Sequence, residues 1–210
     1  MEFTPSCMKC PRLAGFLAEV RHDYPDYHGL PVSSFGDDNP HLLIVGLAPG
    51  MHGANRTGRP FTGDHAGILL YQTLHRFGFS NQAEGASRDD GLKLIGCRIT
   101  NAVKCLPPQN KPETSEIIGC NDYLKQELNA IDKGCAVLAL GNVAHAAVLR
   151  ALGLKAKDYV FGHAALHALP NGLKLYDSYH CSRYNTQTKR LTTAMFEAVF
   201  ASIKNQLEGV

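Results

Sequence analysis

Short apolar runs that alternate with helical patterns constrain the fold of this chain more than any other feature. The run HLLIVG at 41–46 is rich in branched residues, which is typical of a buried strand. Three further strands are predicted, at 97–103, 136–140 and 173–180. Helices are predicted at 65–77, 113–131 and 142–152, and a closing helix begins at a Thr188 N-cap. This alternation predicts an α/β fold with a mostly parallel sheet that is covered on both faces.

The length and composition indicate an ordinary globular protein. A chain of 210 residues can bury a proper core, and we expect a single domain over 1–210. The net charge of +2 permits a nucleic-acid partner without arguing for one, so any binding patch must be local. No apolar run approaches the ~20 residues that span a bilayer, and no leader opens the chain. We therefore expect a cytoplasmic protein.

Four of the seven cysteines have a spacing that suits a metal centre. Cys7 and Cys10 form a C-x-x-C pair, and Cys105 and Cys120 have 14 residues between them. Four thiolates can hold a zinc ion or an iron–sulfur cluster, and the alternative is four unrelated buried cysteines. The remaining three cysteines lie in or next to predicted strands and are interpreted as plain buried thiols: Cys97, Cys135 and Cys181.

Three segments rich in glycine and polar residues follow or end predicted strands. They are GLAPGMHGANRTGRPFTGD at 46–64, TNAVKCLPP at 100–108 and HCSRYNTQTKRLT at 180–192. Ligands of parallel sheets bind beyond the carboxyl ends of the strands, so we expect these segments to form one site. The first segment lacks both the G-x-G-x-x-G and the G-K-[ST] patterns, which disfavours a dinucleotide or triphosphate site.

Several side chains in these segments are candidates for ligand recognition. Arg56 and Arg59 suit phosphates, while Phe61 either stacks on a planar ligand or lies in the core under the loop. Asn101 ends a strand, where its amide either reads a base edge or caps a turn. His180 lies at the mouth of the sheet, which favours a functional role. Six other histidines are interpreted as surface or packing residues: His22, His28, His41, His65, His75 and His145.

The three segments, in this order, resemble the uracil-DNA glycosylase superfamily, and most closely its iron–sulfur type-b group, family five. LGNVAH at 140–145 also matches a family segment, and the resemblance runs from the C-x-x-C pair to the final helix. It implies a three-layer α/β/α sandwich around a short, mostly parallel sheet. It also implies a structural [4Fe–4S] cluster that ties the N-terminal segment to the proline-rich loop, with the ligands Cys7, Cys10, Cys105 and Cys120.

The resemblance implies a hydrolase of base excision repair that flips uracil out of DNA and cleaves its N-glycosidic bond, leaving an abasic site. It places His180 at uracil O2, where a neutral imidazole donates to the developing anion. Phe61 is expected to stack on the base and Asn101 to read its Watson–Crick edge. The further base-binding residues that it implies are Gly46, Leu47, Ala48, His52, Asn55 and Asn185.

The group that activates water is the open point of this mechanism. Many glycosylases of the superfamily carry an acidic residue at the second or third position of the opening motif, where this chain has Leu47 and Ala48. The first carboxylate is Asp64, which either positions water or the sugar, or caps the following helix with Thr62 as the alternative cap. A broad base-binding surface also suggests deaminated purines such as hypoxanthine as substrates.

DNA that contains uracil or another deaminated base is the expected partner, bound by a monomer. Cys181 stands where proline often follows the motif histidine, so the closing loop is expected to be less rigid. Arg183 and Tyr184 match the loop that wedges into DNA, and Asn185 is expected to fix this loop or a phosphate. The residues expected on backbone phosphates are Arg56, Arg59, Lys189 and Arg190, the last two with a solvated helix end as the alternative.

Two other functions compete with this one. The missing early carboxylate favours a non-catalytic or covalently trapping DNA-binding relative, but the retained Asp64, Asn101 and His180 argue against it. A metal-stapled nucleotide-binding or redox protein on the same sheet is disfavoured, because the chain has no phosphate-loop or flavin-type fingerprint.

Overall fold

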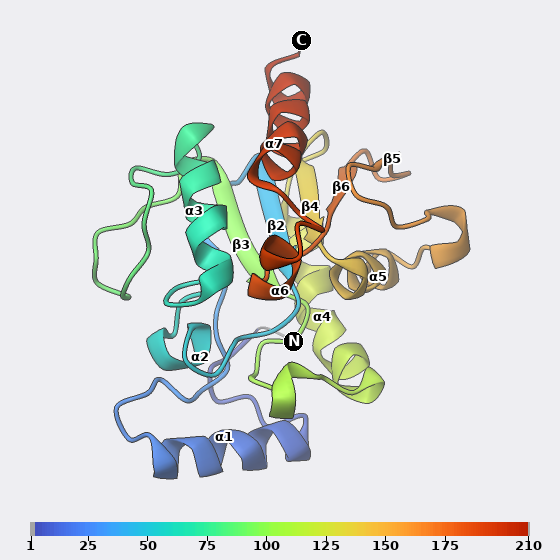
Figure 1. Ribbon diagram of the computed structural model, residues 1–210. Helices are drawn as coiled ribbons and strands as arrows, with labels where there is room; N and C mark the ends of the chain where they lie inside the picture. Colours follow the sequence, from blue (N-terminus) through green and yellow to red (C-terminus); the bar gives the residue numbers. More distant parts are fainter. Residues whose placement is uncertain (1–2, 210) are drawn as a thin grey trace.

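A six-stranded sheet forms the centre of the protein, of which the computed structural model describes residues 3–209 (Figure 1). The strand order is β1-β3-β2-β4-β6-β5. The four inner strands are parallel, and the outer strands β1 and β5 pair antiparallel with their neighbours. The strands are β1 (Phe35–Gly36), β2 (Leu42–Gly46), β3 (Cys97–Asn101), β4 (Ala136–Leu140), β5 (Leu166–Ala168) and β6 (Lys174–Ser178). The prediction of a mostly parallel sheet is confirmed.

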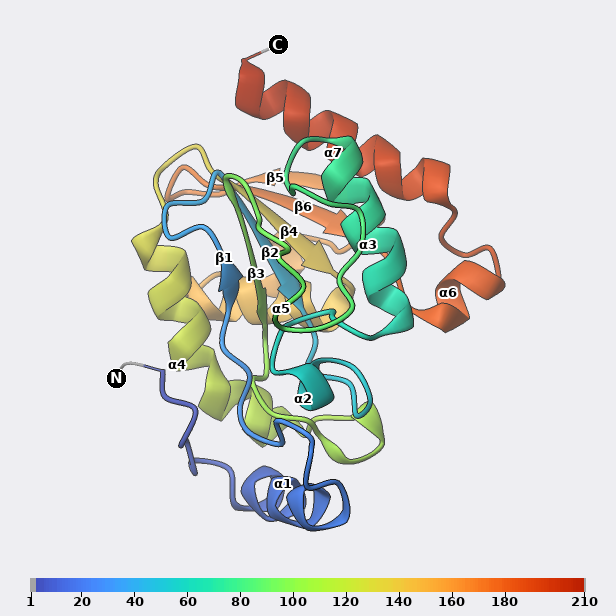
Figure 2. The same ribbon diagram turned by 90° about the vertical axis from the view of Figure 1, so that its left-hand side faces the viewer.

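Two helices cover each face of the sheet, which makes the three-layer sandwich (Figure 2). Side chains of a strand point to opposite faces in turn. Leu42 and Ile44 therefore join one apolar cluster with α3 and α7, while Leu43 and Val45 join another with α4 and α5. These helices are α3 (His65–Arg76), α4 (Thr114–Ala130), α5 (Asn142–Ala151) and α7 (Thr193–Glu208). Within the described residues, no helix has both the length and the apolar character to cross a membrane.

A third apolar cluster joins the N-terminal helix α1 (Pro11–Asp23) to the loop after β3 and to α4. Leu13 and Leu17 of α1 pack there with Val103 and Tyr123. Helix α1 was not predicted. Other elements that the sequence patterns did not predict are the short α2 (Ala54–Thr57) and α6 (Arg183–Gln187), the 3₁₀ turns η1 (Pro108–Asn110) and η2 (Ala156–Asp158), and the edge strands.

The closing helix begins later than predicted, after a Thr192 N-cap, so the predicted Thr188 N-cap is wrong. Thr188 follows the last residue of α6, and its hydroxyl donates to the Tyr184 carbonyl at 2.8 Å. Lys189 then takes a left-handed φ of 58°, which breaks the helical path. The final helix α7 starts afresh after Thr192, whose hydroxyl accepts the Met195 N–H at 3.2 Å.

His145 is a buried packing residue, and both of its ring nitrogens face acceptors. Its Nδ1 lies 2.7 Å from the Asp177 carboxylate and its Nε2 lies 2.9 Å from the Tyr159 carbonyl. These contacts favour the protonated ring, in which both nitrogens are donors. Burial alone would lower the pKa of His145, but the hydrogen bond and charge of Asp177 outweigh burial and raise it. The pair joins α5 to β6.

Candidate active site

A cavity of about 520 Å³ lies at the carboxyl ends of β2, β3 and β6. All three segments that the sequence singled out contribute to it, as expected for a parallel sheet. In Figure 1, α2, α3 and α6 gather at this end of the sheet. The lining residues are Leu47, Ala48, Gly50, Ala54, Phe61, Asp64, His65, Ala66, Asn101, Asn110, His180, Ser182 and Arg183.

Asn101 forms the floor of the cavity at the end of β3, and Gly46 at the end of β2 pairs with it. A Cβ on Gly46 would lie 2.8 Å from Phe61 Cζ and would also overlap the Asn101 amide oxygen, so only glycine fits there. That oxygen, Asn101 Oδ1, is buried and has no hydrogen-bond partner among residues 3–209. A buried acceptor without a partner is costly and indicates a ligand that donates to it.

Phe61 and His180 form a wall of near-parallel rings, with centroids 5.9 Å apart and planes at 26°. Phe61 is buried in the core cluster and also lines the cavity, so the two readings of this residue, core and stacking, are compatible. Its backbone has a left-handed φ of 55°, a costly conformation for an aromatic residue that is concentrated at functional sites.

His180 is held in place from behind and is kept neutral. The Asn185 side-chain amide donates to the His180 carbonyl at 2.8 Å, so Asn185 positions the loop and does not line the cavity. Burial lowers the pKa of His180 to about 4. At neutral pH the ring is therefore an uncharged imidazole, which can donate one N–H to a ligand.

Asp64 occupies the N-cap position of α3, but its side chain makes no capping hydrogen bond. It instead accepts the Ala54 N–H of α2 at 3.4 Å, so the capping alternative is not what the structure shows. Two glycines of the opening segment make room for it. A Cβ on Gly50 would lie 2.8 Å from Asp64 Oδ1, and one on Gly53 would overlap the carboxyl group itself.

The surroundings of the Asp64 carboxylate suit a general base, a group that accepts a proton. Burial raises the pKa of its carboxyl group, and the Ala54 N–H and the positive charges of Arg56 and His52 oppose that shift. A carboxylate with a raised pKa accepts a proton more readily at neutral pH. It faces the same cavity as Asn101 and His180.

Arg59 is not a phosphate ligand, which corrects the sequence prediction. Its side chain is buried and forms a bidentate pair with Asp90, with N–O distances of 2.8 and 2.7 Å. Its Nε also donates to the Thr62 hydroxyl at 2.7 Å, so neither residue is free for its predicted role. The pair holds the pKa of Asp90 well below its usual range and anchors the loop that contains it.

Besides Asn185, three predicted base-binding residues do not line the cavity: Gly46, His52 and Asn55. Asn55 is fully buried and its side-chain amide donates to the Met51 carbonyl at 3.5 Å. His52 is exposed, and its Nδ1 lies 2.9 Å from the Tyr27 hydroxyl. The predictions for His52 and Asn55 came from their place in the motif, and in the structure neither side chain reaches the cavity.

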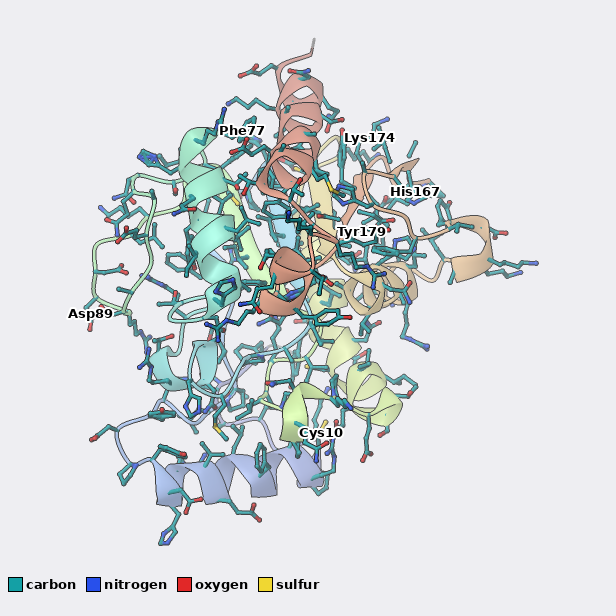
Figure 3. The ribbon with its side chains drawn as sticks, viewed as in Figure 1. Cys10, Phe77, Asp89, His167, Lys174 and Tyr179 are labelled. Carbon is teal, nitrogen blue, oxygen red and sulfur yellow. The ribbon has the colours of Figure 1, made fainter. Side chains whose placement is uncertain are left out.

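The residues predicted to face DNA, other than Arg59, are exposed on the surface. Arg183 lines the cavity, and Tyr184 beside it on α6 is 70% exposed. Arg56 and Lys189 are exposed. The Arg190 guanidinium lies 4.8 Å from the centroid of the Tyr179 ring (labelled in Figure 3), which fixes the direction of this side chain.

The four predicted cluster ligands meet beside α1. They line one small apolar cavity: Cys7, Cys10, Cys105 and Cys120. Figure 3 shows Cys10 next to the start of α1, and its sulfur would lie 3.8 Å from a Cβ on Gly119 of α4. All four are free thiols, so this is not a disulfide site.

Two of the four sulfurs accept hydrogen bonds, as the ligands of a metal centre do. The Lys104 N–H donates to Cys120 Sγ at 3.3 Å, and the Tyr123 hydroxyl donates to Cys7 Sγ at 3.3 Å. Burial, with the neighbouring thiols, raises the pKa of Cys105 to about 12. Four such thiols become thiolates together only where a cation compensates their charge, so the residues fit an iron–sulfur cluster or a zinc ion.

The titration of His180 tests the electrostatics of this site. Burial is the cause of the low pKa of the His180 ring. We therefore expect ¹⁵N-histidine NMR spectra to show a titration midpoint near pH 4 instead of the ordinary 6.5. The His180→Ala variant identifies the signal by its disappearance. A midpoint between 6 and 7 would mean that the ring is substantially protonated near neutrality, and would contradict this assignment.

Comparison with known proteins agrees with this geometry. The family model described as the uracil DNA glycosylase superfamily matches residues 33–204. A type-5 uracil-DNA glycosylase of Thermus thermophilus is 43% identical over 204 residues, which cover 95% of this chain and 93% of that protein. A type-5 enzyme of Pyrobaculum aerophilum is 42% identical over 89% of this chain and 83% of its own. A type-4 enzyme of the same organism is 32% identical, covering 74% of this chain and 66% of its own.

Proposed function

Because the chain belongs to the uracil DNA glycosylase superfamily, we propose that the cavity at the end of the sheet holds a uracil base extruded from DNA. The activity is uracil excision in DNA repair, and the enzyme is a uracil-DNA glycosylase, a hydrolase of N-glycosyl bonds. The observation that carries the assignment of the site is the buried, unpartnered Asn101 Oδ1, which lies in one cavity with a neutral His180 and the Asp64 carboxylate.

The base is recognised by the floor and the wall of the cavity. The imide N–H of uracil needs an acceptor, which Asn101 Oδ1 supplies, and the Asn101 amide N–H groups face the adjacent carbonyl of the base. Phe61 stacks on the ring, and the backbone of Gly46, Leu47 and Ala48 lies beneath it.

His180 stabilises the leaving group. The bond between N1 of uracil and C1′ of the sugar breaks with its electron pair moving to the base, which becomes an anion. A neutral imidazole N–H donates to the O2 atom, where much of this charge resides. The ring does not need to give up its proton, so the cost of forming an imidazolate is avoided.

Asp64 acts on the sugar side of the same bond. Water adds to C1′ of the oxocarbenium-like sugar, and its proton passes to the Asp64 carboxylate. The negative charge of Asp64 also stabilises the positive sugar before water attacks. No carboxylate at Leu47 or Ala48 is then required.

Hypoxanthine in DNA is a second proposed substrate. Its six-membered ring presents an N–H beside a carbonyl oxygen, the same pair of groups as the uracil edge that Asn101 would read. Recognition that depends on one amide and stacking, with few other polar contacts, tolerates this larger base.

The surface around the mouth is the proposed DNA interface. Tyr184 or Arg183 fills the gap left by the flipped base, since both are exposed at the start of α6. Arg56 on α2 contacts backbone phosphates, as do Lys189 and Arg190 of the closing loop that Asn185 holds.

We propose that the four cysteines bind a structural [4Fe–4S] cluster. When bound, the cluster would cross-link the N-terminal segment to the core. Cys7 and Cys10 precede α1, whereas Cys105 follows β3 and Cys120 lies on α4. The thiolates would therefore fasten α1 to the loop that runs past the active site.

Excision on defined duplexes tests the function. We expect the purified protein to release the base from a duplex with one uracil, so that alkali then breaks the labelled strand at that position. The same assay with hypoxanthine tests the second substrate. Binding to the uracil duplex without strand breakage would instead support the non-catalytic or trapping alternative.

The role of Asp64 is tested by two variants that reach it in different ways. Asp64→Asn removes the carboxylate that accepts the proton of water, and we expect kcat to fall by about 100-fold or more. Gly53→Ala keeps the carboxylate but places a Cβ at the position of the Asp64 carboxyl group, so we expect a similar fall in kcat. Gly15→Ala, which has open space around the added Cβ, is the matched control and retains full activity. An active Asp64→Asn enzyme would rule out Asp64 as the group that accepts the proton of water.

The cluster is tested by iron and acid-labile sulfide analysis. Cys105→Ser and Cys120→Ser are expected to lose both elements and to unfold at a lower temperature, because the link between α1 and α4 is broken. Cys97→Ala changes a buried thiol on β3 outside the group and keeps both elements. If the wild-type protein contains zinc and neither iron nor sulfide, the four cysteines hold a single zinc ion and not a cluster.

A further inference from the structure

Three side chains that do not line the active-site cavity converge on one point. Asp177 is fully buried, and each of its carboxylate oxygens faces an imidazole. His145 Nδ1 lies 2.7 Å from Oδ1, and His167 Nε2 lies 3.3 Å from Oδ2. One nitrogen or oxygen atom from each of the three residues lies within 4.8 Å of the others. The three residues therefore form a compact set of potential metal ligands, separate from the four cysteines.

The register of the sheet and the packing of α5 bring the three residues together. His167, labelled in Figure 3, lies on β5, opposite Leu175 of the antiparallel neighbour β6. Asp177 comes two residues after Leu175, so its side chain and that of His167 share one face of the sheet. Leu175 belongs to the apolar cluster that includes α5, and α5 supplies His145 to this same face. Regular elements of the fold therefore hold all three side chains.

The hydrogen bond on the far side of His145 determines which ring nitrogen faces Asp177 without a fixed proton. His145 Nε2 lies 2.9 Å from the Tyr159 carbonyl, which only accepts, so Nε2 carries a proton. The lone pair on Nδ1 of a neutral ring then points at a carboxylate, and a cation between them, either a proton or a metal ion, relieves the repulsion. Metal-bound histidines commonly donate their other ring N–H to a backbone carbonyl. His145 therefore has the orientation of a metal ligand.

The chemistry of the three donors favours zinc. Two imidazole nitrogens and one carboxylate oxygen suit Zn²⁺, whereas Mg²⁺ and Ca²⁺ prefer sites made of oxygen. Ligands of a tetrahedral zinc ion at about 2.0 to 2.1 Å lie about 3.3 Å from one another, close to the distance between His167 and Asp177. The His167 side chain is 16% exposed, so an ion can enter from solvent and a water can be the fourth ligand. We propose that His145, His167 and Asp177 bind a zinc ion.

Zinc takes the place of a proton in this site. Without zinc, burial lowers the pKa of His145, but the hydrogen bond and charge of Asp177 outweigh burial and favour a proton on Nδ1. Zn²⁺ displaces that proton to solvent, and neutral His167 binds through Nε2 with its own proton on Nδ1. One proton is released for each ion bound, so zinc binding tightens as pH rises. The ion joins α5 and β5 to β6, the strand that leads to His180.

Zinc binding to the wild-type protein, with its cysteine site loaded as purified, is the first test. Competition with a chromogenic chelator is expected to give one ion per chain with a Kd below about 10 µM. The X-ray absorption spectrum at the zinc edge is expected to show nitrogen and oxygen neighbours at about 2.0 to 2.1 Å. Weaker binding, or zinc whose neighbours are sulfur atoms at about 2.3 Å, overturns the site.

Two histidine variants show which side chains hold the ion. His167→Gln removes one ligand from the edge strand, and we expect the Kd for zinc to rise about 100-fold or more. His163→Gln is the matched control, because His163 lies in the same segment, is half-buried like His167, and is outside the group of three. Its Kd is expected to match that of the wild type. An unchanged Kd in His167→Gln, or an equal rise in both variants, contradicts the proposal.

Thermal unfolding separates a lost ligand from a damaged fold. An ion that binds only the folded chain raises the unfolding temperature. Zinc is therefore expected to stabilise the wild type and His163→Gln but not His167→Gln, and circular dichroism without zinc shows whether each variant folds. If His167→Gln does not fold, the neighbours seen at the zinc edge in the wild type decide the site without it. None of these readouts uses uracil excision, so failure of the proposed function leaves the zinc site standing.

Discussion

Strand β2 is paired on both edges, with β3 and with β4, and all five of its residues are buried. A strand in this position has no side that can face water, so each residue must pack against one helical layer or the other. Its last residue, Gly46, ends the pattern because the chain must there approach Asn101 and Phe61 more closely than any side chain allows. The same strand that organises the core therefore ends in the floor of the cavity, and the chemistry is placed on the most rigid part of the fold.

The glycines of the opening segment make room for side chains of the protein itself. Gly46 admits Asn101 and Phe61, while Gly50 and Gly53 admit the Asp64 carboxylate. A glycine-rich loop after a strand is more often associated with an anion held by backbone amides. Here the anion in the loop is a carboxylate of the chain, fixed where it can act on a bound substrate. The late position of this acid in the motif follows from the path of the loop, which must turn through α2 before Asp64 returns to the cavity.

The central strands and the helices between them were predictable because their apolar runs depend only on local sequence. The sequence also indicated which segments would meet, since the carboxyl ends of parallel strands share an edge. It could not separate Arg56 from Arg59, which lie in one loop with similar flanks, because the partner that buries Arg59 is Asp90, 31 residues later. The same limit applies to Asn110, whose place at the cavity mouth depends on contacts between distant segments. The Thr188 error has a local cause, the left-handed Lys189, which keeps the closing helix from starting before Thr193.

The charges in the site are divided in the way that bond cleavage requires. Breaking the glycosidic bond makes the sugar positive and the base negative, so a useful site places negative charge near the sugar and hydrogen-bond donors near the base. An imidazolium at His180 would be attracted to Asp64 and would weaken the effect of that carboxylate on the sugar. Burial prevents this, because it lowers the pKa of His180 to about 4 while it raises that of Asp64. The same low-polarity environment therefore tunes both groups, which the proposed mechanism uses as a neutral donor on the base side and a more basic carboxylate on the sugar side.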